Sequence, residues 1–343
     1  MSDLSILLID ANAIAYAAMY QPDLAHLKSN GKSTAAIHGA TSSIMSAIKR
    51  HEEAIPFVLW DGNPQWRKDI LPEYKAHRVL KKDGSVDKEK MEIKEQVRIQ
   101  SETIKLLLSD MGIPQIKCPD SEADDVAGFI TKHLDNCSIV MLSPDTDWLQ
   151  ACATTETKKV RWESPRKPGK LIDTEEMRNP KRDEKGKIIL TALKDGPFDS
   201  PKEYITLKAV SGDTSDGILG CPGLGLKTAK KVLDKFGSFE TLWELHEQGK
   251  TPKPKKEATV AASKELIERN IKIMDWDFNP PLSQHVTINA ARIEDPALYD
   301  EYELKRLKDQ RESLNLDERG LQRAIVAVDK ALHLAMYEPE EAV

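Results

Sequence analysis

Ser5-Ile-Leu-Leu-Ile-Asp10 is a short apolar run that ends in a carboxylate, and the pattern recurs in Phe57-Val-Leu-Trp-Asp61 and in Ile139-Val-Met-Leu-Ser-Pro-Asp145. Apolar runs of this length are typical of buried strands. Strand-like runs at about 4–9, 56–60, 113–117 and 138–142 alternate with helical stretches at about 33–51, 87–111 and 123–134. The alternation predicts an α/β fold whose mostly parallel, twisted sheet has helices on both faces.

The acidic residues that follow these strands predict a metal site. Carboxyl ends of parallel strands meet at one edge of the sheet, where ligands bind. Carboxylates gathered there repel one another and take up protons unless a cation neutralises them. Hard divalent cations with oxygen ligands resolve this conflict. Nine residues stand at such motif-like positions: Asp10, Asp61, Glu122, Asp124, Asp125, Asp145, Asp147, Asp213 and Asp216.

Each acidic motif also has a purely structural interpretation. Glu122-Ala-Asp-Asp125 places carboxylates on one helical face, but acidic residues also suit the first turn of a helix. Ser143-Pro-Asp-Thr-Asp147 could be an ordinary Asp-rich turn. Ser211-Gly-Asp-Thr-Ser-Asp216 adds two more carboxylates three positions apart. Their occurrence together favours the metal site.

The composition is that of a globular protein, with 40% hydrophobic and 31% charged residues among 343. No apolar run approaches the roughly 18 residues of a spanning helix, and the N-terminal run does not have the form of a signal peptide. The four cysteines are widely spaced, which argues against zinc and for reduced buried thiols. The net charge of −6 argues at first against a nucleic-acid partner.

The charge balance changes if the nine carboxylates face metal. Setting them aside leaves 47 of the 56 acidic residues against 50 Lys and Arg, a balance of +3. Six Lys/Arg lie between Arg67 and Lys82, and six between Lys158 and Lys170. Such runs are usually solvated faces, but flanking an acidic cluster they suit a site that cuts phosphodiesters.

Gly220-Cys-Pro-Gly-Leu-Gly-Leu-Lys-Thr-Ala229 nearly spells a P-loop, but Leu226 separates the second glycine from the lysine. A helix-hairpin-helix is the better interpretation, because a Pro-Gly-x-Gly turn that opens a helix can hold a DNA phosphate with its amides. Gly223, Gly225, Lys227 and Lys230 are its expected DNA contacts. The alternative is a plain glycine turn between packed helices.

The remainder of the chain divides in three. We expect a catalytic domain over 1–200, in which 163–200 is a long insertion or loop. A helical region over 201–280 has helices at about 202–210, 226–236, 239–246 and 256–274. A helical extension over 281–343 is expected to form two charged amphipathic helices from 298 onward. Its stripe of Leu321, Ile325, Val328 and Leu332 predicts core packing.

Several motifs come in the order of a known family. They are Leu7-Leu-Ile-Asp10, Trp60-Asp-Gly62, Arg67-Lys68, Leu71-Pro-Glu-Tyr-Lys-Ala-His-Arg78, Glu122–Asp125, Ser143–Asp147, Gly212–Asp216 and the hairpin that follows. Over roughly 4–275 the chain resembles the structure-specific 5′-nucleases: flap endonucleases, phage 5′-exonucleases and the 5′-nuclease domain of bacterial DNA polymerase I. The Tyr74–Arg78 segment resembles the bacterial and phage branch. The length of 163–200 and the C-terminal tail depart from the family pattern.

The resemblance implies a PIN-like fold and hydrolysis of DNA near 5′ ends, giving 5′-phosphate and 3′-hydroxyl products. It implies two Mg²⁺ ions, with Mn²⁺ as a substitute. Asp10, Asp61, Glu122 and Asp124 would surround the first metal, and Asp145, Asp147 and Asp213 would serve the second; Asp125 and Asp216 would support them. Lys75 and Arg78 would hold the scissile phosphate, and Tyr74 would stack on a terminal base. An arch over about 64–100 would admit a single-stranded 5′ end and carry the expected DNA contacts Arg67, Lys68, Lys81 and Lys82.

The expected partners are DNA with 5′ flaps, nicks or ends, with RNA–DNA hybrid as a further target and replication proteins in trans. We expect a monomer without a membrane partner, in the cytoplasm of a bacterial or phage-infected cell. Two alternatives stay open: a PIN-like ribonuclease, and a non-catalytic DNA-structure-binding protein that keeps the fold.

Overall fold

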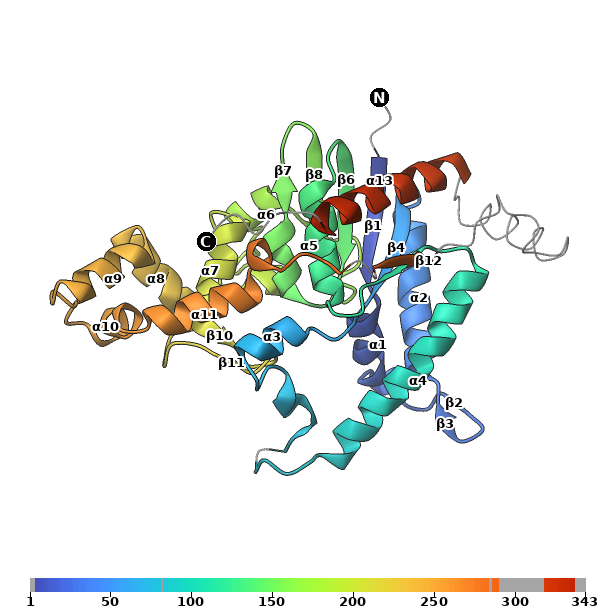
Figure 1. Ribbon diagram of the computed structural model, residues 1–343, viewed down its shortest axis with the longest axis horizontal. Coiled ribbons are helices and arrows are strands. Elements are labelled where there is room, and N and C mark those ends of the chain that lie inside the picture. Colours follow the sequence, from blue (N-terminus) through green and yellow to red (C-terminus); the bar gives the residue numbers. More distant parts are fainter. Residues whose placement is uncertain (1–3, 82, 284–285, 290–317, 337–343) are drawn as a thin grey trace, which may run out of the picture. The chain divides into compact units, whose positions relative to one another are not determined.

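The computed structural model describes residues 4–81, 83–283, 286–289 and 318–336. They divide into two compact units (Figure 1). Unit 1 takes its residues from 1–64, 88–173 and 281–343, and unit 2 from 65–87 and 174–280. The expected catalytic domain over 1–200 is therefore shared between the two units, and the expected arch over 64–100 is divided at residue 88.

Unit 1 is built on one sheet with the strand order β12-β5-β4-β1-β6-β8-β7, and β9 also pairs with β8. The central strands are parallel: β5 (Gln115–Lys117), β4 (Ile55–Trp60), β1 (Leu4–Asp10), β6 (Cys137–Leu142) and β8 (Lys158–Glu163). Three antiparallel strands lie at the margins: β12 (Thr287–Asn289), β7 (Ala153–Thr154) and β9 (Leu171–Ile172). The predicted mostly parallel sheet is confirmed.

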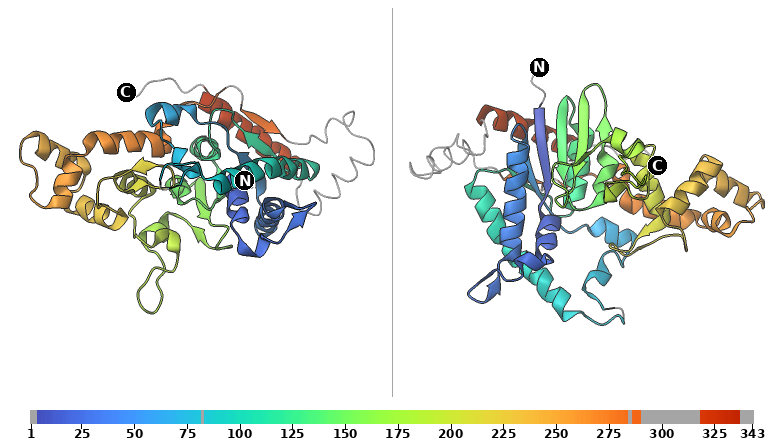
Figure 2. Two further views of the ribbon diagram at one scale, coloured as in Figure 1. Left: turned by 90° about the horizontal axis from the view of Figure 1, so that it is seen from below. Right: turned by 180° about the vertical axis from the view of Figure 1, so that it is seen from behind.

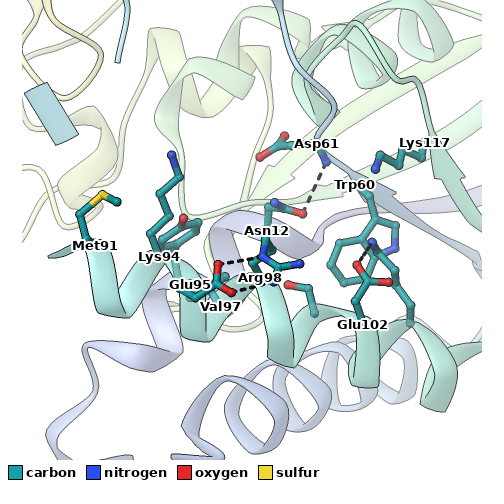
Figure 3. Close-up of a pocket in the computed structure, with 13 residues that line it drawn as sticks. Asn12, Trp60, Asp61, Met91, Lys94, Glu95, Val97, Arg98, Glu102 and Lys117 are labelled. Atoms are coloured by element: carbon teal, nitrogen blue, oxygen red, sulfur yellow. Dashed lines mark hydrogen bonds and ion pairs between the residues drawn. The ribbon is translucent and has the colours of Figure 1, made fainter. Parts of the chain in front are cut away.

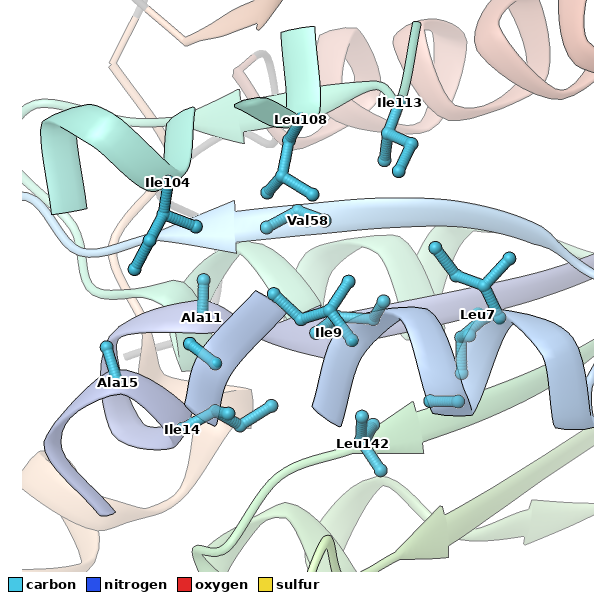
Figure 4. Packing of buried hydrophobic residues seen from close by; sticks show 14 of the residues in the cluster. Leu7, Ile9, Ala11, Ile14, Ala15, Val58, Ile104, Leu108, Ile113 and Leu142 are labelled. Carbon is cyan, nitrogen blue, oxygen red and sulfur yellow. The ribbon is translucent and has the colours of Figure 1, made fainter. Parts of the chain in front are cut away.

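Alternate residues of the central strands face opposite layers of helices. Leu7, Ile9 and Val58 pack in a core with side chains from three helices on one face (Figure 4). These helices are α1 (Ala11–Met19), α2 (Ala35–Arg50) and α4 (Lys88–Asp110). The opposite layer contains α5 (Ala123–His133), which contacts β1 and β4. Helices on both faces are thereby confirmed.

The C-terminal part of the chain completes unit 1. Strand β12 adds to the edge of the sheet beside β5, and α13 (Glu318–Met336) packs on α5 and β4. The predicted core stripe of α13 is confirmed, because all four of its side chains are at most 8% exposed: Leu321, Ile325, Val328 and Leu332. The first of the two helices expected in this tail lies outside the described residues.

Several short elements of unit 1 were not predicted. They are α1, the hairpin of β2 (Lys28–Ser29) and β3 (Lys32–Ser33), 3-10 turns η1 (Pro22–Leu24) and η3 (Thr146–Ala151), and strands β7, β8, β9 and β12. In β8, basic residues alternate with buried apolar ones, since Val160 and Trp162 are buried next to Lys159 and Arg161 in the sequence. Lys158 donates to the carbonyls of Thr131 and Lys132 at the carboxyl end of α5, both at 3.1 Å.

Unit 2 is mainly helical, as expected. It contains α3 (Gln65–Ile70), η2 (Ala76–Val79), α6 (Thr174–Arg178), η4 (Thr191–Leu193), α7 (Pro201–Ser211), α8 (Leu226–Phe236), α9 (Phe239–Glu247), α10 (Lys255–Ala261), α11 (Lys264–Met274) and η5 (Trp276–Phe278). The helix predicted at 256–274 is two helices, α10 and α11. A small hairpin of β10 (Gly212–Asp213) and β11 (Ile218–Leu219) follows α7. Figure 2 gives two further views of these elements.

Candidate active site

The carboxyl ends of three neighbouring strands form the acidic edge of unit 1. Strand β1 lies between β4 and β6, with Asp10 in register with Leu59 and Ile9 in register with Leu142. Asp61 therefore follows the strand on one side of Asp10, and Asp145 follows the strand on the other. The predicted gathering of these three carboxylates at one edge is what the topology produces.

Asp10 is the buried centre of this edge, with 5% of its surface exposed. Its Oδ1 accepts the amide N–H of Ala13 at 3.1 Å, which caps α1, and its Oδ2 accepts the hydroxyl of Ser143 at 2.7 Å. Burial and the charge of Asp61 raise the pKa of Asp10 to about 7, against the lowering effect of the two hydrogen bonds; Asp145 raises it further. The three carboxylates are thus close enough to repel one another.

The first turn of α5 carries the second acidic motif. Glu122 and Asp125 are buried, and Asp124 is partly buried. Asp125 Oδ2 accepts the amide N–H of Glu122 at 2.8 Å, so this carboxylate caps the helix. Asp61 Oδ1 accepts the amide N–H of Ala123 at 2.9 Å and thereby joins β4 to the same helix end. Helix capping and the gathering of acids occur together in this motif.

The third motif lies in the loop between β6 and η3. Asp145 Oδ1 accepts the amide N–H of Asp147 at 2.9 Å, and the Asp145 amide donates to Ser143 Oγ at 3.0 Å. The indole N–H of Trp162 donates to the carbonyl oxygen of Asp145 at 3.0 Å. Asp145 is exposed and Asp147 partly exposed. The loop that carries both acids is therefore fixed by hydrogen bonds to its backbone.

The donor set of this edge suits a divalent cation held through water. Only carboxylate oxygens are offered, which Mg²⁺ prefers, and Mg²⁺ keeps several of its waters in protein sites. Within the described ranges, no three acidic, histidine or cysteine side chains are grouped closely enough to enclose one ion directly. The mutual repulsion at Asp10 shows negative charge that a hydrated cation would neutralise.

The two remaining predicted metal ligands lie in unit 2, where cations surround them. Asp213 Oδ2 accepts a hydrogen bond from Lys208 Nζ at 2.8 Å. Burial raises the pKa of Asp213, but Lys208 and the hydrogen bonds from Ser215 outweigh burial and lower this pKa to about 2. Asp216 accepts the hydroxyl of Tyr74 at 3.1 Å and Arg78 Nη2 at 2.5 Å, and Lys75 Nζ lies 3.6 Å away. The structure thus joins Asp216 to all three residues predicted as catalytic.

Lys75 has an unusual backbone conformation. Its φ of 57° lies in the left-handed region, and its amide N–H donates to the carbonyl oxygen of Asp216 at 2.8 Å. For a residue other than glycine this conformation costs free energy and is found mostly where function requires it. Its side chain is 24% exposed, and that of Arg78 is 48% exposed.

Two of the predicted nucleic-acid contacts are buried. Tyr74 is 4% exposed, so its ring offers no open face for stacking on a base. Arg67 is 2% exposed, and its Nε donates to the carbonyl oxygen of Ile273 at 3.1 Å. The guanidinium of Arg67 also lies 4.4 Å from the ring centroid of Trp66. As the structure stands, both side chains belong to the interior of unit 2.

The other predicted DNA contacts differ in their surroundings. Lys227 is 64% exposed with its Nζ 3.8 Å from Asp195, whereas Lys230 is held by Glu203 at 2.5 Å and Asp234 at 3.2 Å. Gly223 has a φ of +74°, and a Cβ added there or at Gly225 would meet no atom within 4 Å. This turn at the start of α8 is therefore open to an approaching group. Lys81 is exposed, Lys68 is partly buried, and Lys82 lies outside the described residues.

A cavity of about 370 Å³ adjoins Asp61 within unit 1 (Figure 3). Asn12, Asp61, Lys94 and Lys117 line it, together with residues of α4. Asn12 Oδ1 accepts the amide N–H of Asp61 at 3.4 Å. The volume is within the range of ligand sites, and lysines near an acidic edge suit an anionic ligand that approaches a metal-bearing site.

Sequence patterns did not identify Ser143, Trp162 or Asn12 as site residues. Ser143 connects Asp10 to Asp145, Trp162 holds the backbone of Asp145, and Asn12 holds that of Asp61. Ser143 lies within the Ser143–Asp147 motif. The alternation of apolar and basic residues in β8 could have indicated that Trp162 is buried. No local pattern distinguishes Asn12, because its contact depends on the pairing of β1 with β4.

The sheet and the helices just described correspond to the two domain models of the 5′-3′ exonuclease family. Residues 5–180 match the N-terminal resolvase-like domain of that family and residues 199–296 match its C-terminal SAM fold. The chain therefore belongs to the 5′-3′ exonuclease family and is a nuclease. The resemblance expected from the motifs is confirmed.

Curated relatives agree with this assignment. A 5′-3′ exonuclease of Halalkalibacterium halodurans is 30% identical over 268 residues, covering 73% of this chain and 77% of the relative. A 5′-3′ exonuclease of Mycobacterium tuberculosis is 26% identical over 259 residues, covering 72% and 75%. DNA polymerase I of Chloroflexus aurantiacus is 29% identical over 245 residues, which are 70% of this chain but only 23% of the polymerase.

The fold is also that of a solved phage nuclease. The bacteriophage T5 flap endonuclease, crystallised with DNA and metal ions, matches with a TM-score of 0.60 and 22% identity, covering 91% of this chain and 100% of the phage chain. At this identity the match supports the shared fold. Among the described residues, no helix is long and apolar enough to span a membrane, and the four cysteines are buried free thiols.

Proposed function

We propose that this 5′-3′ exonuclease hydrolyses DNA phosphodiesters near 5′ ends with two Mg²⁺ ions, for which Mn²⁺ can substitute. It would release 5′-phosphate and 3′-hydroxyl products and also act as a flap endonuclease. The observation that carries the proposal is the buried carboxylate of Asp10, whose charge is opposed by Asp61 and Asp145. A cation of the kind that nuclease chemistry uses would offset this repulsion and keep Asp10 in its charged form.

The proposed metal ligands come from the acidic motifs of unit 1, with Asp213 from unit 2. Asp10, Asp61, Glu122 and Asp124 would hold the first ion, and Asp145, Asp147 and Asp213 the second, largely through water. Asp125 and Asp216 would position neighbouring groups. When bound, such a pair of ions activates the attacking water and stabilises the leaving oxygen of a phosphodiester.

Lys75 and Arg78 are the proposed catalytic cations that hold the scissile phosphate. Preorganised donors aimed at developing charge are among the largest contributions to catalysis. Asp216 would hold both side chains in register before the substrate arrives, and the left-handed backbone of Lys75 fixes where its side chain leaves the chain. Tyr74, being buried, would act by orienting Asp216 rather than by stacking on a base.

The proposed substrates are DNA with 5′ flaps, nicks or ends, with RNA–DNA hybrid as a further target. The open turn at Gly223 and Gly225 with Lys227 would bind backbone phosphates without reading sequence. Lys68, Lys81 and Lys82 would add contacts along an arch at about 64–100 that admits a single strand. The enzyme would work as a cytoplasmic monomer and meet replication proteins in trans.

Product mapping on 5′-labelled flap, nick, hybrid and single-stranded RNA substrates, with and without Mg²⁺, tests the proposal. Metal-dependent cleavage of flapped DNA with 5′-phosphate products is expected. Asp145→Asn should abolish cleavage yet retain DNA binding, and Lys75→Ala should slow single-turnover cleavage by about 100-fold or more. Cleavage confined to RNA would replace the proposal with a ribonuclease, and unchanged turnover of Asp145→Asn would remove the metal assignment.

A further inference from the structure

A basic hairpin lies between the two segments that match the family. Its sequence is Lys181-Arg-Asp-Glu-Lys-Gly-Lys-Ile-Ile189. The matches cover 5–180 and 199–296, so the hairpin lies outside both. It belongs to unit 2, where it forms the yellow-green loop that projects in the left view of Figure 2. What it does is therefore not explained by the common framework of the family.

The hairpin is held by its own hydrogen bonds. Asp183 N–H donates to the carbonyl oxygen of Lys187 at 2.8 Å, and Ile189 N–H donates to that of Lys181 at 3.0 Å. Asp183 Oδ1 accepts the amides of Lys185 at 3.0 Å and Lys187 at 2.9 Å, which fixes the turn. A turn closed in this way presents its side chains in a defined arrangement.

The base of the hairpin is anchored in the core of unit 2. Ile188 is 7% exposed, and Leu193 and Phe198 are fully buried. The amide of Phe198 donates to the carbonyl oxygen of Met177 at 2.9 Å, which brings together the two sides of the insertion. The backbone of the hairpin is therefore joined to the unit at its base, which limits the backbone conformational entropy lost when the projecting end binds.

The projecting end carries more positive than negative charge, since Lys181, Arg182, Lys185 and Lys187 stand against Asp183 and Glu184. Residues 181–187 are all exposed. Lys181 lies 3.9 Å from Glu176, but among the described residues no carboxylate oxygen comes within 4.0 Å of the charged nitrogens of Arg182, Lys185 or Lys187. Arg182 Nη1 donates only to the uncharged carbonyl of Gly186, at 2.8 Å. One of the two acids of the hairpin, Asp183, is engaged with the turn.

We propose that the basic hairpin binds the phosphate backbone of duplex DNA. This contact would add to the one made by the open turn before α8. The inference rests on the proposed DNA substrate. Lysine and arginine on a fixed turn can meet phosphates without reading bases, and each neutralised phosphate releases condensed counterions. Two contacts carried by one unit raise the effective concentration of each for the same duplex. The open glycine turn in unit 2 favours DNA over an acidic protein as the partner.

The test is equilibrium binding of a nicked duplex that carries a 5′ flap. The dissociation constant is measured by fluorescence anisotropy in EDTA at increasing salt concentrations. The triple variant R182Q/K185Q/K187Q should bind at least about tenfold more weakly, with a log–log salt slope shallower by about 2. The charge-retaining variant R182K/K185R/K187R should restore the wild-type slope. R319Q/R323Q/K330Q also removes three exposed charges, from α13, and should leave the slope unchanged. Circular dichroism checks that every variant is folded.

The outcomes separate this contact from the proposed function. If the wild-type enzyme cleaves and binds the duplex while the triple variant keeps the same slope, the hairpin contact is overturned and the nuclease proposal stands. If the variant is weakened only on the isolated flap strand, the duplex assignment is overturned. If affinity for duplex is unchanged but capture of an acidic protein is lost, the partner is a protein instead. Failure of the wild-type enzyme to bind or cleave any DNA would refute the proposed function itself.

Discussion

Ser143 donates its hydroxyl hydrogen to Oδ2 of Asp10 at 2.7 Å, and both side chains are buried at the carboxyl ends of neighbouring strands. The same hydroxyl oxygen accepts the amide of Asp145 at 3.0 Å. One side chain thus orients the carboxylate of Asp10 and fixes the backbone that carries Asp145. Ser143→Ala should lower metal affinity or cleavage by about 10- to 100-fold, as the loss of an outer-shell partner does.

The Mg²⁺ concentration that gives half-maximal cleavage is the measurement for Ser143→Ala. A purely structural role would lower the melting temperature without moving that concentration. Ser138→Ala is the matched control, because Ser138 lies on the same strand but bonds to Arg161 at 3.1 Å, away from the carboxylates. Equal Mg²⁺ requirements for the two variants would show that Ser143 does not position the site.

Asp10 should destabilise the metal-free protein at neutral pH. Burial and the charge of Asp61 raise its pKa from 3.8 to about 7, so the folded state retains a proton that the unfolded state loses between these values. Stability from this group therefore falls as pH rises through that window and stays low above it. Asp10→Asn keeps an α1 cap and removes the charge, so it should abolish cleavage yet stabilise the metal-free protein at pH 8 by about 1 kcal/mol or more.

Thermal melts with and without Mg²⁺ check this expectation for Asp10. Mg²⁺ should raise the melting temperature of the wild-type protein at pH 8 more than that of Asp10→Asn, because the cation relieves the repulsion that the substitution has already removed. A lower melting temperature for metal-free Asp10→Asn would contradict the charge argument.

Glu163 stabilises unit 1 through a buried charge network at the end of β8. Arg50 Nη2 lies 2.5 Å from Oε1 and His51 Nε2 lies 2.7 Å from Oε2. Burial alone would raise the pKa of Glu163, but hydrogen bonds from His51, Gly169 and Arg50 outweigh it and lower the pKa below 4.5. This contribution is fully present above pH 4.5 and is lost as pH falls through the lowered value.

Glu163→Gln should therefore cost about 3 kcal/mol at pH 7, at the lower end for a broken buried pair because Arg50 is partly exposed. Urea denaturation at a series of pH values should show the difference from wild type shrinking once the pH falls below the folded pKa. Glu95→Gln removes an exposed partner of Arg98 and should leave the unfolding midpoint unchanged. A cost for Glu163→Gln that does not depend on pH would rule out the charge network.

The acidic edge was predictable because two local patterns determine it. Apolar runs set the strands, and the residue after each run falls at the carboxyl edge. The pairing of β1 with both β4 and β6 then places Asp10 between Asp61 and Asp145. Strand β8 was harder to predict, because the lysines and the arginine that alternate with the buried Val160 and Trp162 make the segment look like a charged surface run.

Contacts between residues distant in sequence were not predictable. For Asp216 the motif predicts a role in supporting the metal ligands, and nothing in it indicates the contacts that Tyr74, Lys75 and Arg78 make with this carboxylate. The burial of Arg67 depends on the carbonyl oxygen of Ile273, some two hundred positions away, and charge alone predicts a surface residue. Composition and periodicity carry no information about such partners, which only the packed chain brings together.

The C-terminal helix offers the sharpest test of how the tail contributes to the fold. Helix α13 packs on α5, which is capped by Glu122 and carries Asp124 in its first turn. Within α13, Val328 is fully buried, whereas Val326, two positions earlier, is 58% exposed. Val328→Asp would bury an unpaired charge and should cost at least about 3 kcal/mol, while Val326→Asp should change stability by no more than about 0.5 kcal/mol. Both free energies of unfolding are measured by urea denaturation monitored by circular dichroism.

Equal effects of the two substitutions would show that α13 does not complete the core. A cleavage rate lowered for Val328→Asp alone, below its melting temperature, would link the packing of α13 to the acids of α5.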